Sequence, residues 1–160
     1  MKASARNQFS GTVSDVVIGV VNAEVHVSLK GAATIVATIT KESVETLDIK
    51  SGVSVIALVK APQIIVVTDF GGYRLSARNQ LQGTVTEVKP GAVNTEIDIE
   101  LSGGEKVFAT VTNDSVKTLE LHKGQAATAI FKAGAVILAV AASGFPERRG
   151  HYVAGNECKT

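Results

Sequence analysis

The chain has 160 residues, of which 45% are hydrophobic and 19% charged, and its formal net charge is +1. This length allows one ordinary domain or two very small ones, and the near-neutral charge gives no bulk reason to expect affinity for nucleic acid or membranes. Aromatic residues make up 4% of the chain, so base-stacking surfaces would be scarce. Because the chain has no apolar run of membrane-spanning length, no apolar leader and only one cysteine, Cys158, the sequence favours a cytoplasmic protein without disulfides.

The first half of the chain is predicted to be mainly β-strand. Residues 25–29 alternate between apolar and polar side chains, which is typical of a half-buried strand. Residues 53–59 and 64–67 are rich in β-branched side chains and predict two further strands. Before these two strands, residues 40–47 open with Thr40, a residue type that caps helices, and predict one short helix.

The second half repeats the first at an offset of 72 residues without a gap. Between residues 4–61 and 76–133, 26 of the 58 aligned pairs are identical. Self-similarity of this extent indicates a duplicated structural unit. The second copy therefore predicts a helix at residues 112–119 and strands at residues 97–101, 125–131 and 136–140.

About five strands and one short helix in each copy predict an all-β fold of two tandem OB-fold-like five-stranded barrels. The expected division is a first domain at residues 1–68, a linker at 69–75 and a second domain at 76–142. Residues 143–160 are polar, contain three glycines and one proline, and repeat nothing in the first copy. We expect them to form a disordered tail.

No constellation of side chains in the sequence predicts catalysis. The three histidines, His26, His122 and His151, are not matched by histidine at the repeat offset, so a site shared by both copies would not use them. Cys158 has no recognisable partner, and the sequence contains neither a Walker-type glycine-rich loop nor a nucleophile elbow. We therefore expect neither an enzyme nor a site for a free metal cation.

The polar residues that both copies retain are suited to an oxyanion. Arg6 and Lys60 recur at the repeat offset, whereas other surface lysines do not. Arginine offers fork-like donors, lysine supplies a point charge, and serine or threonine hydroxyls also donate. The simpler interpretation is that these are solvated surface charges and that Thr40 is an ordinary helix cap. Their joint retention favours a shared anion site.

Several repeated motifs in fixed order resemble the Mop domain of molbindins. The first is Ser-Ala-Arg-Asn-Gln at residues 4–8 and 76–80, and the second is the turn at residues 19–24 and 91–96. The third is Ala-x-x-Thr at residues 37–40 and 109–112, and the last is the Lys-Ala pair at residues 60–61 and 132–133. The match covers residues 1 to about 142 in two copies. The chain is similar to a di-Mop molbindin.

The resemblance implies an OB-type fold and a homotrimer that binds molybdate or tungstate at subunit interfaces. The ligand residues that it implies are Ser4, Ala5, Arg6, Thr40, Lys60 and Ala61, with Ser76, Ala77, Arg78, Thr112, Lys132 and Ala133 in the second copy. It also implies a second class of site near the three-fold axis, for which the turn residues Val21, Asn22, Val93 and Asn94 are candidates.

The predicted function is therefore intracellular storage and homeostasis of molybdenum by a molybdate- or tungstate-binding protein. Proteins of molybdenum-cofactor biosynthesis are candidate partners, and neither nucleic acid nor membrane is expected to bind. Two alternatives stay open, namely an assembly or regulatory module without its own ligand and a nucleic-acid-binding OB protein. The sequence does not distinguish molybdate from tungstate.

Overall fold

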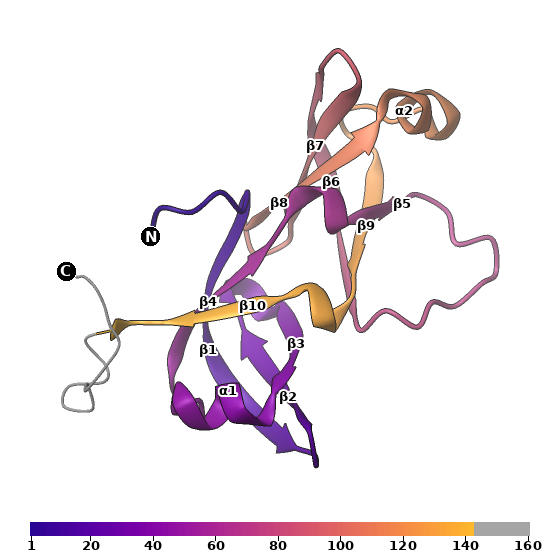
Figure 1. Cartoon of the computed structure of the whole chain (residues 1–160). Helices are drawn as coiled ribbons and strands as arrows, with labels where there is room; N and C mark the ends of the chain where they lie inside the picture. The colour runs from indigo at the N-terminus through magenta and orange to yellow at the C-terminus, as the bar shows by residue number, and fades with distance from the viewer. Residues whose placement is uncertain (143–160) are drawn as a thin grey trace.

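The computed structural model describes residues 1–142, so the expected tail at residues 143–160 lies outside the described part. These 142 residues form two five-stranded sheets, one below the other in Figure 1, with two short α-helices. The expected all-β fold with two five-stranded units and one short helix in each is confirmed.

The first repeat contains five strands, β1 to β5. The alternating segment at residues 25–29 overlaps β2, which ends at Ser28 and in which Ala23, Val25 and Val27 face the core. Helix α1 begins after Thr40, whose side chain accepts a hydrogen bond from the Ser43 amide and so caps the helix. The elements are β1 (Asn7–Ile18), β2 (Asn22–Ser28), the 3-10 turn η1 (Lys30–Ala32), β3 (Thr34–Thr40), α1 (Lys41–Thr46), β4 (Ser54–Val59), the 3-10 turn η2 (Ala61–Gln63) and β5 (Ile65–Val67).

The second repeat has the same elements in the same order, apart from the first short turn. Thr112 caps helix α2 through the amide of Ser115, as Thr40 caps α1. The elements are β6 (Asn79–Pro90), β7 (Asn94–Leu101), β8 (Lys106–Thr112), α2 (Asn113–Leu119), β9 (Ala126–Phe131), the 3-10 turn η3 (Ala133–Ala135) and β10 (Ile137–Val140).

The two repeats exchange their last strands. The first sheet has the order β10-β4-β1-β2-β3, so its fifth strand comes from the second repeat. The second sheet has the order β5-β9-β6-β7-β8 and takes its fifth strand from the first repeat. In Figure 1, β10 runs beside β4 in the lower half, and β5 lies beside β9 in the upper half. The division at residues 1–68, 69–75 and 76–142 stays a prediction about the sequence repeats, because neither sheet is confined to one repeat.

The hydrophobic core is continuous between the two sheets. Its members are mostly valine, isoleucine, leucine and alanine from alternate strand positions. It also contains two aromatic side chains, Phe9 and Phe131. The exchanged strands contribute Val66 and Leu138, which are 6% and 7% exposed. Each sheet therefore completes its core with side chains from the other repeat.

The turns at Gly31 and Gly103, which are equivalent at the repeat offset, approach each other closely. A Cβ atom added to Gly31 would lie 2.2 Å from the Cα atom of Gly103, and Gly31 has a φ angle of +68°. Only glycine satisfies both the contact and the backbone angle without strain. This contact, together with the exchanged strands, relates the repeats by an approximate two-fold axis.

Candidate functional site

An open cavity of about 440 Å³ lies where the N-terminal segment meets the ends of β4 and β10. Ser4 and Ala5 come from the segment before β1, and Lys60 follows the last residue of β4. The turn η3 reaches the same cavity from the second repeat, because β10 pairs with β4 in the first sheet. The lining residues are Ala3, Ser4, Ala5, Leu58, Lys60, Gln63, Gly134, Ala135 and Ile137.

The polar side chains that line this cavity have no partners. Within residues 1–142, the side chains of Ser4, Lys60 and Gln63 make no hydrogen bond or ion pair. No carboxylate is among the described residues that line the cavity, so the Lys60 ammonium is its one formal charge. An uncompensated cation beside a free hydroxyl and a free amide can accommodate an anion with several oxygen acceptors.

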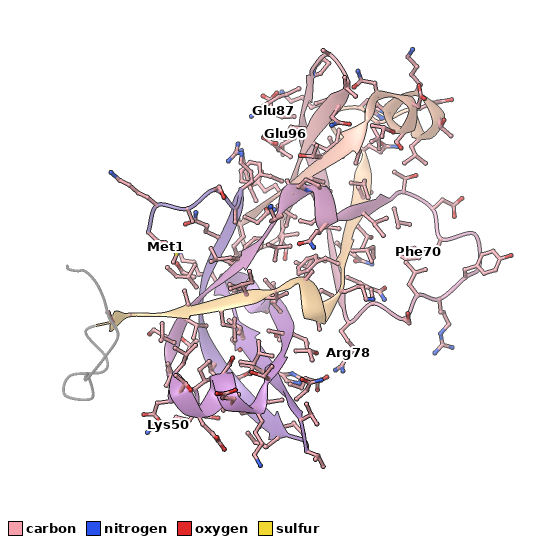
Figure 2. The ribbon with its side chains drawn as sticks, in the orientation of Figure 1. Met1, Lys50, Phe70, Arg78, Glu87 and Glu96 are labelled. Carbon is pink, nitrogen blue, oxygen red and sulfur yellow. The ribbon has the colours of Figure 1, made fainter. Side chains whose placement is uncertain are left out.

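The arginine of each opening motif is directed toward the other repeat. Arg6 donates to the carboxylate of Glu96 through Nε at 3.3 Å and Nη2 at 3.1 Å, and its guanidinium lies 3.9 Å from the ring centroid of Phe108. In the same way Arg78 pairs with Glu24. Figure 2 shows Arg78 beside the sheet of the first repeat and Glu96 on the sheet of the second. Arg6 is therefore placed near, but not among, the residues that line the cavity.

Thr40 and Thr112 are not brought into this cavity. Thr40 ends β3, two residues beyond Thr38, which pairs with Glu24. Because Arg78 pairs with Glu24, the arginine of the second repeat reaches the sheet that contains the threonine of the first. In the second repeat, Thr112 ends β8 two residues beyond Thr110, which pairs with Glu96, the partner of Arg6. The predicted ligand set of the first repeat is thus not gathered in one place, since Ser4, Ala5 and Lys60 line the cavity whereas Arg6 and Thr40 do not.

The remaining predicted residues are placed as follows. Ala61 and Ala133 begin the turns η2 and η3 and are buried, while Ser76, Ala77 and Lys132 occupy in the second repeat the positions of Ser4, Ala5 and Lys60. The turn residues Val21 and Val93 are exposed, at 69% and 73%, and Asn22 and Asn94 make no side-chain hydrogen bond within residues 1–142. His26 contacts Glu24, and His122 contacts the Glu120 carbonyl.

The motif asparagines, Asn7 and Asn79, have a structural role that sequence reasoning missed. The Asn7 amide bonds both backbone groups of Phe108, accepting from N–H at 2.7 Å and donating to the carbonyl at 2.8 Å. Asn79 bonds the backbone of Val36 in the same way, at 2.7 and 2.8 Å. Both are buried, at 0% and 1% exposure, and each follows a motif arginine. Because Asn7 and Asn79 are identical at the repeat offset, the sequence could have indicated that this asparagine has a role in both repeats.

Two further charged residues, Lys89 and Asp98, lie at the Glu96 end of these contacts. Lys89 lies 3.5 Å from Glu96 and 3.2 Å from Asp98, whose side chain is 3% exposed and whose Oδ1 atom has no hydrogen-bond partner within residues 1–142. Burial, together with a hydrogen bond to Glu96, raises the pKa of Asp98 above its ordinary value. Burial would also raise the pKa of Glu96, but hydrogen bonds from Asp98 and Arg6 outweigh it and lower that pKa.

Replacing Asp98 by Asn should therefore stabilise the protein at neutral pH by on the order of 1 kcal/mol. Since the folded-state pKa of Asp98 is raised, ionising this carboxyl costs more free energy in the folded than in the unfolded protein, and the wild-type protein loses stability as the pH rises from the ordinary pKa through the folded-state pKa. The asparagine amide can still donate to Glu96. Urea unfolding at pH 7 and pH 4 should show the gain at pH 7 only. Asp15→Asn, at an exposed carboxylate of β1, is the matched control, and an equal gain in both variants would contradict this explanation.

Within residues 1–142, no group of three or more His, Cys, Asp or Glu side chains is placed to hold a metal ion. None of the helices in this part of the chain has the length and apolar character needed to cross a bilayer. His151 and Cys158 lie outside the described residues.

Both repeats match a known domain family. The pattern of the TOBE domain matches twice, at residues 3–66 and 75–138, and the chain belongs to this family as a tandem pair of TOBE domains. The resemblance to the di-Mop molbindins is confirmed.

The relatives are transport, binding and regulatory proteins. The chain is 47% identical to the molybdenum transport protein ModE of Herbaspirillum seropedicae over 140 residues, which are 88% of this chain and 52% of the relative. It is 39% identical to the molybdenum-pterin-binding protein MopA of Rhodobacter capsulatus, over 88% of this chain and 53% of that protein. The chain thus spans about half the length of the curated relatives it matches.

The chain also matches a solved structure over the whole length of that protein. The cytoplasmic molybdate-binding protein ModG, crystallised with molybdate bound, superimposes with a TM-score of 0.86 and is 48% identical. The match covers 88% of this chain and 100% of that chain.

Proposed function

We propose that the chain binds molybdate or tungstate, with one site for each repeat. The observation that carries this proposal is the cavity at Ser4 and Lys60, where unpaired donors face an open space that no carboxylate lines. Ser76 and Lys132 repeat these donors in the second copy. The resemblance to ModG, whose structure contains molybdate, supports the choice of a tetrahedral oxyanion.

The donor set suits a dianion without protons. The Lys60 ammonium supplies charge, and the Ser4 hydroxyl can direct its proton toward an anion oxygen. Each charge-assisted hydrogen bond contributes about 1.5–3 kcal/mol, so a few of them would support micromolar or tighter binding. The pairs Arg6–Glu96 and Arg78–Glu24 leave the arginines beside the sites, where they add positive charge or exchange their carboxylate partner for the anion.

We infer that the binding unit is a homotrimer in the cytoplasm, used for storage and homeostasis of molybdenum rather than for catalysis. The cavity is open at its rim, where Ile137 is 63% exposed, and its repeat counterpart Ile65 is 60% exposed. Apolar side chains at these positions would be covered by neighbouring copies, which would also close the sites. Proteins of molybdenum-cofactor biosynthesis are the proposed recipients of the anion.

Two of the relatives are transcriptional regulators, and one of these is the DNA-binding regulator ModE of Escherichia coli, which is 33% identical to this chain. The matched region is about half of such proteins. The tandem domains would then serve as the anion-sensing part of a regulator, and the same sites would be used. Direct nucleic-acid binding by the tandem domains is not favoured by a net charge of +1 and an aromatic content of 4%.

Replacing both Lys60 and Lys132 by alanine should weaken molybdate binding tenfold or more at each site, which corresponds to about 1.4 kcal/mol. The loss follows from removing the one cationic donor that lines each proposed site. Calorimetric titration of the full chain with sodium molybdate measures it directly. Sedimentation of the same samples should give a trimer, because the lysines are exposed and contribute little to folding.

The matched control replaces Lys106 and Lys123 by alanine, which removes the same total charge from exposed positions that do not line the cavity. This control should bind molybdate like the wild-type protein. Unchanged affinity in the Lys60 and Lys132 variant would show that the site lies elsewhere. Failure of the wild-type protein to bind molybdate or tungstate would overturn the proposed function.

A further inference from the structure

Gln63 contributes an unassigned polar group to the cavity. It is the last residue of η2, three positions after Lys60, and it is exposed and lines the cavity. Within residues 1–142, its amide makes no hydrogen bond. A free carboxamide carries two N–H donors and one carbonyl acceptor, so it can turn a donor toward an anion without breaking an existing contact.

The cavity residues can be compared with their counterparts at the repeat offset. Ser4, Ala5 and Lys60 are matched by identical residues, and Leu58 and Ile137 are matched by isoleucine. Gln63 is matched by Ala135, which has no hydrogen-bonding side chain. Gln63 is therefore the one polar lining residue of this cavity that the second repeat does not reproduce.

The turns η2 and η3 lie next to each other, since Gln63 and Ala135 both line the same cavity. From the approximate two-fold relation we infer an equivalent anion site beside Lys132, with the same two turns in exchanged roles. Gln63 lines the cavity beside Lys60, and one side-chain amide cannot bind an anion in both cavities at once. The two cavities consequently differ by one hydrogen-bond donor.

We propose that Gln63 makes the two oxyanion sites of the chain unequal, by donating a side-chain hydrogen bond to the anion in the first-repeat cavity that the second-repeat cavity lacks. This inference rests on the proposed function and adds to it a residue that determines affinity. One neutral hydrogen bond changes a binding constant by about threefold to tenfold. The chain should therefore hold two classes of anion site in equal number, with the tighter class at Lys60 and Gln63.

Titration calorimetry of the full chain with sodium molybdate tests the inequality. The wild-type protein should show two classes of site, each with one anion per chain. Gln63→Ala should weaken the tighter class by about threefold to tenfold and leave the other unchanged, so that a single weaker class is observed. Gln63→Glu should abolish the tighter class, because a carboxylate would face the anion, and again leave the other class unchanged.

Gln82→Ala is the matched control, since Gln82 is an exposed amide on β6 that does not line the cavity, and it should bind like the wild-type protein. Circular dichroism of each variant verifies that the fold is retained. If both Gln63 variants bound molybdate as the wild-type protein does, this inference would be overturned and the proposed function would remain intact. If the wild-type protein bound no molybdate, both would fail.

Discussion

Replacing Asn7 or Asn79 by alanine should lower the free energy of unfolding by about 3 kcal/mol for each substitution. Each amide satisfies both the N–H and the carbonyl of one residue in the opposite repeat, Phe108 for Asn7 and Val36 for Asn79. Alanine would leave these backbone groups without partners in a buried region, and each orphaned group costs about 1–3 kcal/mol. Chemical denaturation with a spectroscopic readout measures the loss.

Two further variants give this prediction its controls. Asn7→Asp keeps an acceptor but removes the donor to Phe108 and introduces a buried charge, so it should be at least as destabilising as alanine. Asn22→Ala removes an exposed asparagine without a side-chain hydrogen bond, and its effect should stay within about 0.5 kcal/mol. A loss of stability at Asn7 no larger than that at Asn22 would contradict the assigned role.

The local structure of the chain could be predicted from the sequence because local patterns determine it. Alternation at residues 25–29 correctly indicated β2, and Thr40 and Thr112 correctly indicated the starts of the two helices. The long strands β1 and β6 were harder to predict, since a register shift near Asp15 and Glu87 interrupts their alternation. A bulge of this kind moves later side chains to the opposite face.

The exchange of β5 and β10 could not be predicted from the sequence alone. Ile65–Val67 and Ile137–Val140 are at equivalent positions in the two repeats, and each would pair equally well, by pattern, with β4 or with β9. Alternation identifies a strand and its buried face, but it does not identify the strand beside it. Pairing across the repeats depends on the course of the connecting segment at residues 68–78.

The candidate site could be predicted in part for the same reason. Ser4 and Lys60 were expected to share a site, and the structure brings both to one cavity. Arg6 was expected there as well, yet it pairs with Glu96 of the other repeat. Glu24 and Glu96 are themselves identical at the repeat offset, so the sequence contained this acidic partner. Its relevance depends on a contact between residues that are 90 positions apart.

Ending the chain after residue 135 should destabilise the first sheet, although every described residue that it deletes belongs to the second repeat. The deletion removes β10, which pairs with β4 between Ile137 and Leu58 and between Val140 and Val55. It also removes the buried side chains of Val136 and Leu138. Burial of each contributes about 1.5–3 kcal/mol, so the expected loss is about 3–6 kcal/mol, a large part of the stability of an ordinary domain.

Hydrogen exchange should locate this loss in the first repeat. In the shortened chain β4 becomes an edge strand, so the amides of residues 54–59 should exchange faster, while β9 keeps β5 as its neighbour and stays protected. A chain that ends at residue 142 is the control, because it retains every described strand. Leu138→Ala in that chain is a milder form of the same change and should cost about 2–5 kcal/mol. If β9 lost protection before β4 in these variants, the last strand would belong to the sheet of its own repeat, and the strand exchange would be wrong.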